Sequence, residues 1–213
     1  MLNAYRTFSR TGEKEIVIKR SRFIGYGAPV ESEEEAIAFI AEIRKKHAQA
    51  SHNCFAYMIG ERDQIQRFSD DGEPSGTAGK PILEVLKNQG LQNIAVVVTR
   101  YFGGTMLGAG GLVRAYTDGA VAASEAAEPV DQVLHRLVRV KVDYTWLGKL
   151  ENELRLRETL LDETLYADLV TLQCLPREDD HEAFAAWMTD LTQGQGEIEI
   201  GDPRYVPHDV ISD

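Results

Sequence analysis

The chain has 213 residues, of which 43% are hydrophobic, so it is able to form folded cores and is not a wholly disordered protein. No apolar run approaches the roughly 20 residues that a membrane-spanning helix needs, and the start lacks the apolar segment of a signal peptide. The two cysteines, Cys54 and Cys174, lie far apart, which favours buried thiols over a disulfide framework. These features predict a cytoplasmic protein without a membrane anchor.

The net charge of −11 is unevenly distributed. Residues 1–130 contain 15 Lys/Arg and 16 Asp/Glu, whereas the remaining residues contain 8 and 18, so the two balances are −1 and −10. The change falls at Ala127-Glu128-Pro129, which predicts a domain junction. We expect a first domain over residues 1–130, an acidic second domain over 131–206 and a flexible tail over 207–213. The acidic half argues against a chain-wide electrostatic grip on nucleic acid, but a local basic face on the first half is compatible with it.

The first half alternates strand-like and helix-like patterns. Ser32, followed by Glu35 three residues later, forms a capping box before a helical stripe of apolar residues. The continuous apolar run Ile94–Val98 predicts a strand covered on both faces. The expected strands are 15–19, 22–30, 53–59, 64–69 and 94–98, and the expected helices begin after Ser32, at Lys80 and near Gly111.

The second half repeats this alternation. Its pattern predicts a strand over 138–144, a helix over 147–154, strands near Leu165 and over 170–174, a helix over 184–191 and a strand at 198–200. The order strand–helix–strand–strand–helix–strand is that of a ferredoxin-like domain. No catalytic pattern is present in this half.

Two glycine-rich segments, 70–81 and 99–111, each precede a helix-like pattern, where free N–H groups attract anions. The first is not a nucleotide P-loop, because Pro74 replaces its first glycine and Pro81 replaces the magnesium-binding hydroxyl. The second is not a dinucleotide fingerprint, because Val113 takes the place of the third glycine. Because both segments join sheet-like to helix-like patterns, we expect them to lie together at one end of the domain. No cofactor is predicted.

The basic residues around these segments suggest an anion site. Lys80 at a helix start, Arg100 at a strand end and Arg114 in the next helix could converge on a phosphate or nucleic acid. Gly103, Gly104 and Thr77 complete this candidate anion- or nucleic-acid-binding set. The alternative is that the neighbouring acidic residues pair with these cations and hold the loops, and the sequence favours neither.

The acidic residues and a histidine form a second candidate set. The side chains of His52, Asp70, Asp71 and Glu73 could act as acid–base groups or metal ligands, with Ser75 or Thr77 as a nucleophile. Their spacing matches no metal site, and a lone histidine at a strand end is more often structural. Tyr101-Phe102 could stack on bases, although aromatics at a strand end are more often part of a core. No catalytic residue is therefore assigned.

Three segments together resemble the signature of the IMPACT family, whose bacterial branch includes YigZ. They are Ser51-His52-Asn53-Cys54, the segment 70–81 and the segment 100–108. The resemblance extends from residue 1 to about residue 128, and the acidic half resembles the extra domain of bacterial members. It implies a mixed α/β (α+β) protein of two domains. The first would share the fold of a small-subunit ribosomal protein and of domain IV of elongation factor G, and the second would resemble that factor's ferredoxin-like domain V.

The same resemblance suggests a function. Eukaryotic relatives regulate translation under amino-acid stress by competing for a protein partner of a kinase, and they carry an additional N-terminal interaction domain. This chain starts directly at the shared domain, so the kinase-pathway role is not carried over. We expect a non-enzymatic, translation-linked regulator whose first domain binds RNA, the ribosome or a translation factor. The alternative is an enzyme acting on a small phosphorylated or nucleotide substrate in the cleft between the glycine segments.

Overall fold

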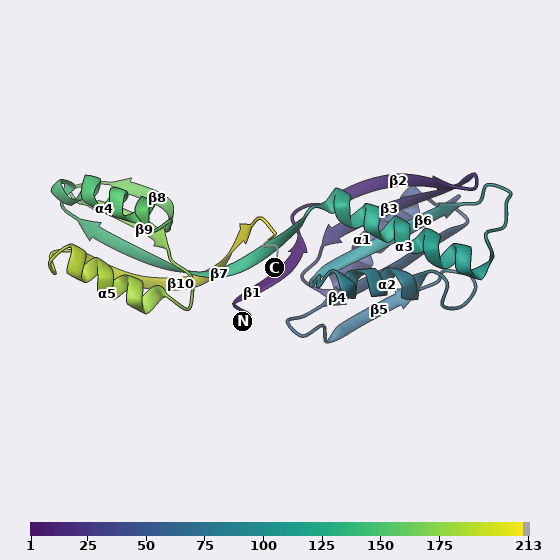
Figure 1. The fold of residues 1–213 in the computed structure, drawn as a ribbon, viewed down its shortest axis with the longest axis horizontal. Helices are drawn as coiled ribbons and strands as arrows, with labels where there is room; N and C mark the ends of the chain where they lie inside the picture. Colours follow the sequence, from purple (N-terminus) through teal and green to yellow (C-terminus); the bar gives the residue numbers. More distant parts are fainter. Residues whose placement is uncertain (211–213) are drawn as a thin grey trace. The chain divides into compact units, whose positions relative to one another are not determined.

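The computed structural model describes residues 1–210 of the chain. The chain forms two compact units, whose main bodies are Tyr5–Asp131 and Gln132–Val206 (Figure 1). Within residues 1–210, no helix is both long enough and apolar enough to cross a membrane. The elements in chain order are β1 (Ala4–Phe8), β2 (Gly12–Ile18), β3 (Ser21–Pro29), α1 (Glu33–Lys46), β4 (His52–Ile59), β5 (Ile65–Ser69), α2 (Gly79–Asn88), β6 (Ile94–Tyr101), α3 (Gly108–Ala127), β7 (Pro129–Val142), α4 (Tyr144–Leu156), β8 (Leu160–Tyr166), β9 (Val170–Leu175), α5 (His181–Leu191) and β10 (Glu197–His208).

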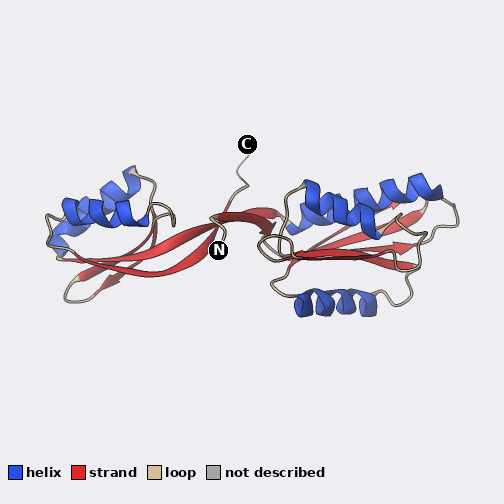
Figure 2. Ribbon diagram, turned by 90° about the horizontal axis from the view of Figure 1, so that it is seen from below, coloured by secondary structure: helices blue, strands red, loops and turns tan. Residues whose placement is uncertain are grey.

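The first unit is built on an antiparallel sheet with the strand order β2-β3-β6-β4-β5. Helices cover both faces of this sheet (Figure 2). Val96 and Val98 of β6 pack in the cluster formed with α2 and α3, whereas Ala95 and Val97 pack in the cluster formed with α1. The apolar run of β6 is therefore covered on both faces, as predicted, although its neighbours are antiparallel.

Helix α1 begins as its capping residues predict. The Ser32 hydroxyl accepts a hydrogen bond from the N–H of Glu35 at 3.2 Å. The Glu35 carboxylate reaches back to the N–H of Glu31 at 2.8 Å, one residue earlier than in the usual capping box.

Helix α3 lies unusually close to the sheet because small residues meet there. A Cβ on Gly25 of β3 would lie 2.3 Å from the carbonyl oxygen of Gly119 in α3. A Cβ on Gly119 would in turn lie 2.8 Å from a methyl group of Val98. The close approach packs the middle of α3 directly against β3 and β6.

The second unit has a ferredoxin-like fold. Its sheet pairs β7 with β9, β9 with β8 and β10 with β7, which gives the order β10-β7-β9-β8, and β1 also pairs with β7. Helices α4 and α5 lie on one face of the sheet (Figure 2). The core consists of the alternate residues of β7 and β9 with Leu150, Leu154, Phe184 and Met188 from the helices.

Two predictions about element boundaries are corrected, and one strand is added. Tyr144, expected in a strand, begins α4, because the Asp143 side chain accepts a hydrogen bond from the N–H of Thr145 at 2.9 Å and caps the helix. Strand β1 was not predicted. Strand β10 continues to His208, into the segment expected to be a flexible tail, and residues 211–213 of that tail lie outside the described residues.

A candidate ligand site between two glycine-rich loops

Residues of both glycine-rich segments line one pocket of the first unit. We call residues 70–78, between β5 and α2, the first loop, and residues 102–107, between β6 and α3, the second loop. The pocket has a volume of about 590 Å³ and is called the loop pocket below. It is lined by Ser51, His52 and Arg100 from strand ends, Glu73 and Pro74 from the first loop, Phe102, Met106 and Leu107 from the second loop, and Gly108, Ala109 and Leu112 from α3.

The Asp70 carboxylate accepts hydrogen bonds from backbone amides at the start of α2. Its Oδ1 accepts hydrogen bonds from the N–H of Ala78 at 3.0 Å and of Gly79 at 2.8 Å, and its Oδ2 accepts one from Gly76 at 2.9 Å. A carboxylate of the chain itself thus fills the position that an external anion would take at this helix end. The start of α2 is therefore not the open anion site that the sequence suggested.

Asp71 and Thr77 also hold the first loop in place. Asp71 accepts a hydrogen bond from the N–H of Asn53 at 2.6 Å and pairs with Arg44 of α1 at 2.9 Å. Thr77 is buried, and its hydroxyl donates to the carbonyl of Pro74 at 2.7 Å. These side chains therefore hold the first loop in place, and Asp71 does so through Arg44, which is not one of the cations considered in the sequence.

Glu73, Arg100 and Tyr116 form a buried polar cluster beneath the loop pocket. Glu73 Oε1 accepts hydrogen bonds from a terminal nitrogen of Arg100 and from the Tyr116 hydroxyl, both at 2.7 Å. Burial raises the pKa of Tyr116 well above its usual range, so its hydroxyl stays protonated and donates. Arg100 is only 5% exposed, so it is neutralised by Glu73 and is not a free cation.

The hydrogen bond of His52 fixes which ring nitrogen carries the proton. Nδ1 lies 2.8 Å from the carbonyl oxygen of Asp71, which can only accept, so Nδ1 donates. In the neutral ring, Nε2 is then an acceptor. Nε2 lies 3.8 Å from Glu73 Oε2, too far for a hydrogen bond. With the ring neutral, two acceptor atoms therefore lie 3.8 Å apart in the wall of the pocket.

The second loop packs against the turn between β2 and β3. The N–H of Gly103 donates to the Ser21 hydroxyl at 3.2 Å, and a Cβ on Gly103 would lie 2.1 Å from the backbone of Arg20, so only glycine fits. Gly104 has a φ of +83° with open space around it, as the turn into α3 requires. Phe102 and Met106 are 52% and 85% exposed at the mouth of the pocket.

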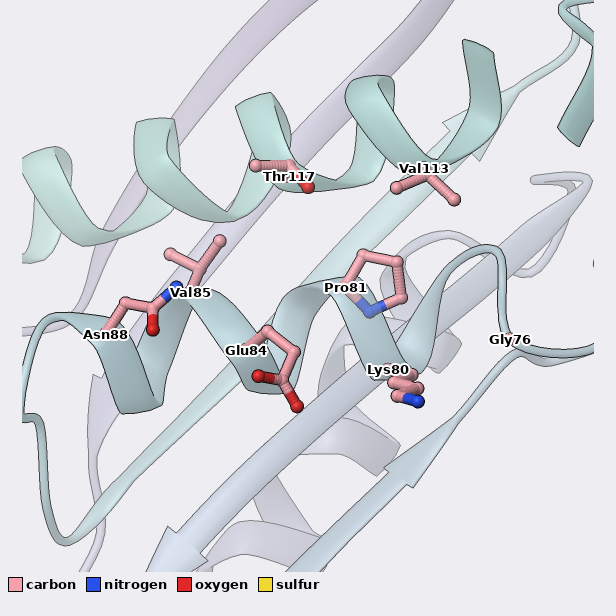
Figure 3. Close-up of a pocket in the computed structure, with 8 residues that line it drawn as sticks. All are labelled: Gly76, Lys80, Pro81, Glu84, Val85, Asn88, Val113 and Thr117. Atoms are coloured by element: carbon pink, nitrogen blue, oxygen red, sulfur yellow. The ribbon is translucent and has the colours of Figure 1, made fainter. Parts of the chain in front are cut away.

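Lys80 and Arg114 do not converge with Arg100, which corrects the expectation of a single phosphate site. Lys80 lines a second pocket of about 370 Å³ between α2 and α3, where Val113 and Thr117 face α2 (Figure 3). Arg114 is exposed on α3. The reason is that the Arg100 side chain is buried, whereas the side chains of Lys80 and Arg114 extend from α2 and α3 into solvent.

The structure adds residues that the sequence did not single out. Lys19 and Arg20 form the exposed β2–β3 turn beside Gly103, and both have positive φ, of 45° and 69°. Tyr116 completes the buried cluster. Two adjacent basic residues between strand-like runs were the only signal for the turn. Among residues 1–210, no three His, Cys, Asp or Glu side chains are grouped so that they could hold a metal ion.

Known proteins share this architecture. Residues 19–124 match the Impact N-terminal domain, and residues 140–195 match a domain of unknown function. The chain is 49% identical to the IMPACT family member YvyE of Bacillus subtilis (strain 168), over 97% of this chain and 95% of that protein. It is 37% identical to the protein IMPACT of Mus musculus, over 44% of this chain and 30% of that protein. A crystal structure described as that of a hypothetical protein matches with a TM-score of 0.60 at 32% identity, covering 93% of this chain and 97% of the other.

Proposed function

Because the chain belongs to the IMPACT family, we propose that it is a translation-linked, cytoplasmic RNA-binding protein that acts through its first unit. The role of eukaryotic relatives in translation suggests this class of partner. The part of the chain that resembles the mouse protein covers less than half of this chain, so the relative's other interactions are not transferred.

One observation carries the proposal: four exposed basic residues lie on the elements that flank the two loops. Lys19, Arg20, Lys80 and Arg114 are exposed, and none forms an ion pair with a residue in the described part of the chain. They leave the β2–β3 turn, the first turn of α2 and the second turn of α3, the elements that surround the two loops. Each carboxylate of the first loop meanwhile accepts at least one hydrogen bond from a backbone amide or an arginine. An array of separated cations suits several successive phosphates better than a single one.

An aromatic face lies among these cations. Phe102 is half exposed, and the guanidinium carbon of Arg100 lies 5.4 Å from the centre of its ring, which orients the side chain. A flat, exposed ring beside cations is the arrangement on which unpaired bases stack. Single-stranded RNA is therefore the form of nucleic acid that this surface fits.

Fluorescence anisotropy of the full chain with labelled single-stranded RNA tests this function. Replacing Lys80 and Arg114 together by alanine should weaken binding, and the log–log salt dependence should flatten by about 0.7 for each phosphate that the variant no longer neutralises. The matched control is Arg62→Ala with Lys87→Ala, which removes the same charge at the β4–β5 turn and at the last turn of α2. Equal weakening in both double variants, or no RNA binding at low salt, would refute the proposed surface.

A second candidate function, an enzyme acting on a nucleotide in the loop pocket, is favoured by the tautomer of His52. Its Nδ1 is held by a backbone carbonyl, so Nε2 could take a proton from a bound hydroxyl. Incubation with ribonucleotides and RNA, followed by mass spectrometry of the products, separates this function from binding alone.

A further inference from the structure

We propose that the loop pocket binds the ribose of a nucleotide with free 2′- and 3′-hydroxyls, which donate hydrogen bonds to His52 Nε2 and Glu73 Oε2. Such a vicinal diol occurs at the 3′ end of RNA and in free ribonucleotides. The inference rests on the proposed function where the ligand is RNA, and it names the group that the pocket recognises.

The first step is an incomplete hydrogen-bond set on Glu73. Its side chain is only 4% exposed, and Oε1 already accepts from Arg100 and Tyr116. Within the described residues, Oε2 accepts no hydrogen bond. Among the described residues, Oε2 is not one of the fully buried side-chain atoms that lack a partner, so it is open to the pocket and keeps its capacity to accept a hydrogen bond. Since Glu73 lines the pocket, a ligand is able to supply the donor.

The second step is the pairing of this oxygen with His52. Nε2 accepts no hydrogen bond from the described residues either, and it lies 3.8 Å from Oε2. Two acceptors this close are both satisfied by a ligand with two donor hydrogens, and a pair of neighbouring hydroxyls is one such group. The hydroxyls of ribose sit on adjacent carbons and on the same side of the ring, so one can donate to each acceptor.

The third step concerns charge, which excludes a cationic donor. An ammonium group would also bring several donors, but Arg100 already pairs with Glu73 at 2.7 Å. A second cation at Oε2 would be repelled by the guanidinium, whereas the pair of Glu73 and Arg100 is neutral towards a hydroxyl. Neutral donors therefore fit this site better than amines.

The rest of the pocket fits the other parts of a nucleotide. Phe102 and Met106 offer exposed apolar surface for a base, and the volume of about 590 Å³ lies in the usual range for small-molecule pockets. Gly108 and Ala109 line the pocket at the start of the 20-residue helix α3, which has no side-chain cap. Its free N–H groups and dipole are able to receive a phosphate. In contrast, Asp70 fills the equivalent position on α2.

The test uses the full chain and a 5′-labelled single-stranded RNA in three forms: with its natural 3′ end, with a 2′,3′-dideoxy 3′ end, and as DNA of the same sequence. The natural 3′ end should bind at least about tenfold more tightly than the dideoxy end, since the dideoxy sugar cannot donate to the two acceptors in the pocket wall. The affinity of the chain for AMP is measured in the same way and compared with its affinities for 2′-deoxy-AMP and 3′-deoxy-AMP. This comparison shows whether a free ribonucleotide is also a ligand.

Two variants connect the discrimination to the pocket. His52→Asn keeps a donor for the carbonyl of Asp71 but removes the Nε2 acceptor, and Glu73→Gln replaces the Oε2 acceptor by a donor. Both should bind the natural and dideoxy ends equally. Thermal melting checks that each variant is folded. If Glu73→Gln does not fold, His52→Asn alone tests the assignment to this pocket.

The outcomes separate this inference from the RNA-binding function. Salt-dependent RNA binding that is indifferent to the 3′ sugar would overturn the inference and leave the proposed function intact. Diol-dependent binding of AMP without any RNA binding would support the inference and refute the proposed function. Unchanged discrimination in folded His52→Asn would overturn the assignment to this pocket.

Discussion

Asp70 accepts a hydrogen bond from the N–H of Gly79 at 2.8 Å, so the start of α2 is bound to a carboxylate from the preceding loop. Helix α3, by contrast, begins without a side-chain cap. The two glycine-rich segments look alike in the sequence, but they have different roles. In the first segment, acidic side chains bind the backbone amides, and the segment forms one wall of the loop pocket. The second segment leaves the N-terminal end of α3 open to that pocket.

Replacing Asp70 by alanine should destabilise the first unit by about 2–4 kcal/mol, because three backbone N–H groups lose their acceptor. Urea unfolding followed by circular dichroism measures the change. The control Asp118→Ala removes the same charge from an exposed position on α3 and should change stability by less than about 0.5 kcal/mol. Equal effects of the two substitutions would show that the loop does not depend on this cap.

Arg100→Met should cost about 3–5 kcal/mol, because it leaves the buried Glu73 carboxylate without its cation. The double variant Arg100→Met with Glu73→Gln should be more stable than the sum of the two single changes predicts. A double-mutant cycle of unfolding free energies measures this coupling. The exposed pair Arg10–Glu128, with side chains 58% and 60% exposed, is the control and should show a coupling below about 1 kcal/mol. Additive effects at Arg100 and Glu73 would contradict the buried pairing.

The elements that the sequence predicted are those whose signals are local. Apolar periodicity located α1, β6 and the ferredoxin-like order of the second unit, because burial of one stripe or face recurs at fixed spacing. Strand β1 has no such pattern. It is short, and its pairing partner β7 begins more than a hundred residues later, so its burial depends on a distant part of the chain.

The glycines identified both loops, but the chemistry of the site depends on backbone positions. Residue types could not show that the carbonyl of Asp71 would fix the proton on His52 Nδ1, or that Asp70 would fill the end of α2. Nor could they show that Arg100 points inward, because Arg100 is paired only through Glu73, which comes from another segment of the chain.

Both cysteines should be unreactive in the native protein. Burial raises the pKa of Cys54 and of Cys174 to about 12, so almost no thiolate exists at pH 8, and neither side chain is exposed. A thiol-reactive disulfide reagent should therefore label two thiols per chain only after denaturation. Ser75→Cys, at an exposed position of the first loop, is the positive control and should react at once. Rapid labelling of the native parent chain would contradict the burial of the thiols.

The first unit should lose stability as the pH falls through about 6.5, because of His47. This residue is 9% exposed, and its ring nitrogens lie 2.6 Å and 2.8 Å from the hydroxyls of Tyr26 and Tyr101. Burial, followed by the charge of Lys46, lowers the pKa of His47 below its usual value of about 6.5. Between the lowered pKa and about 6.5, the unfolded chain binds a proton that the native chain does not, so stability rises with pH in this window and falls as the pH decreases.

Comparison of the parent chain with His47→Gln measures this contribution. The slope of unfolding free energy against pH, between pH 7.5 and the onset of acid unfolding, should be smaller in the variant, by at most about 1.4 kcal/mol per pH unit for one proton. Circular dichroism follows both units, whereas the fluorescence of Trp146 and Trp187 reports only the second unit and serves as the internal control. Identical slopes in the two proteins would show that His47 is protonated with the same pKa in the folded and unfolded chains.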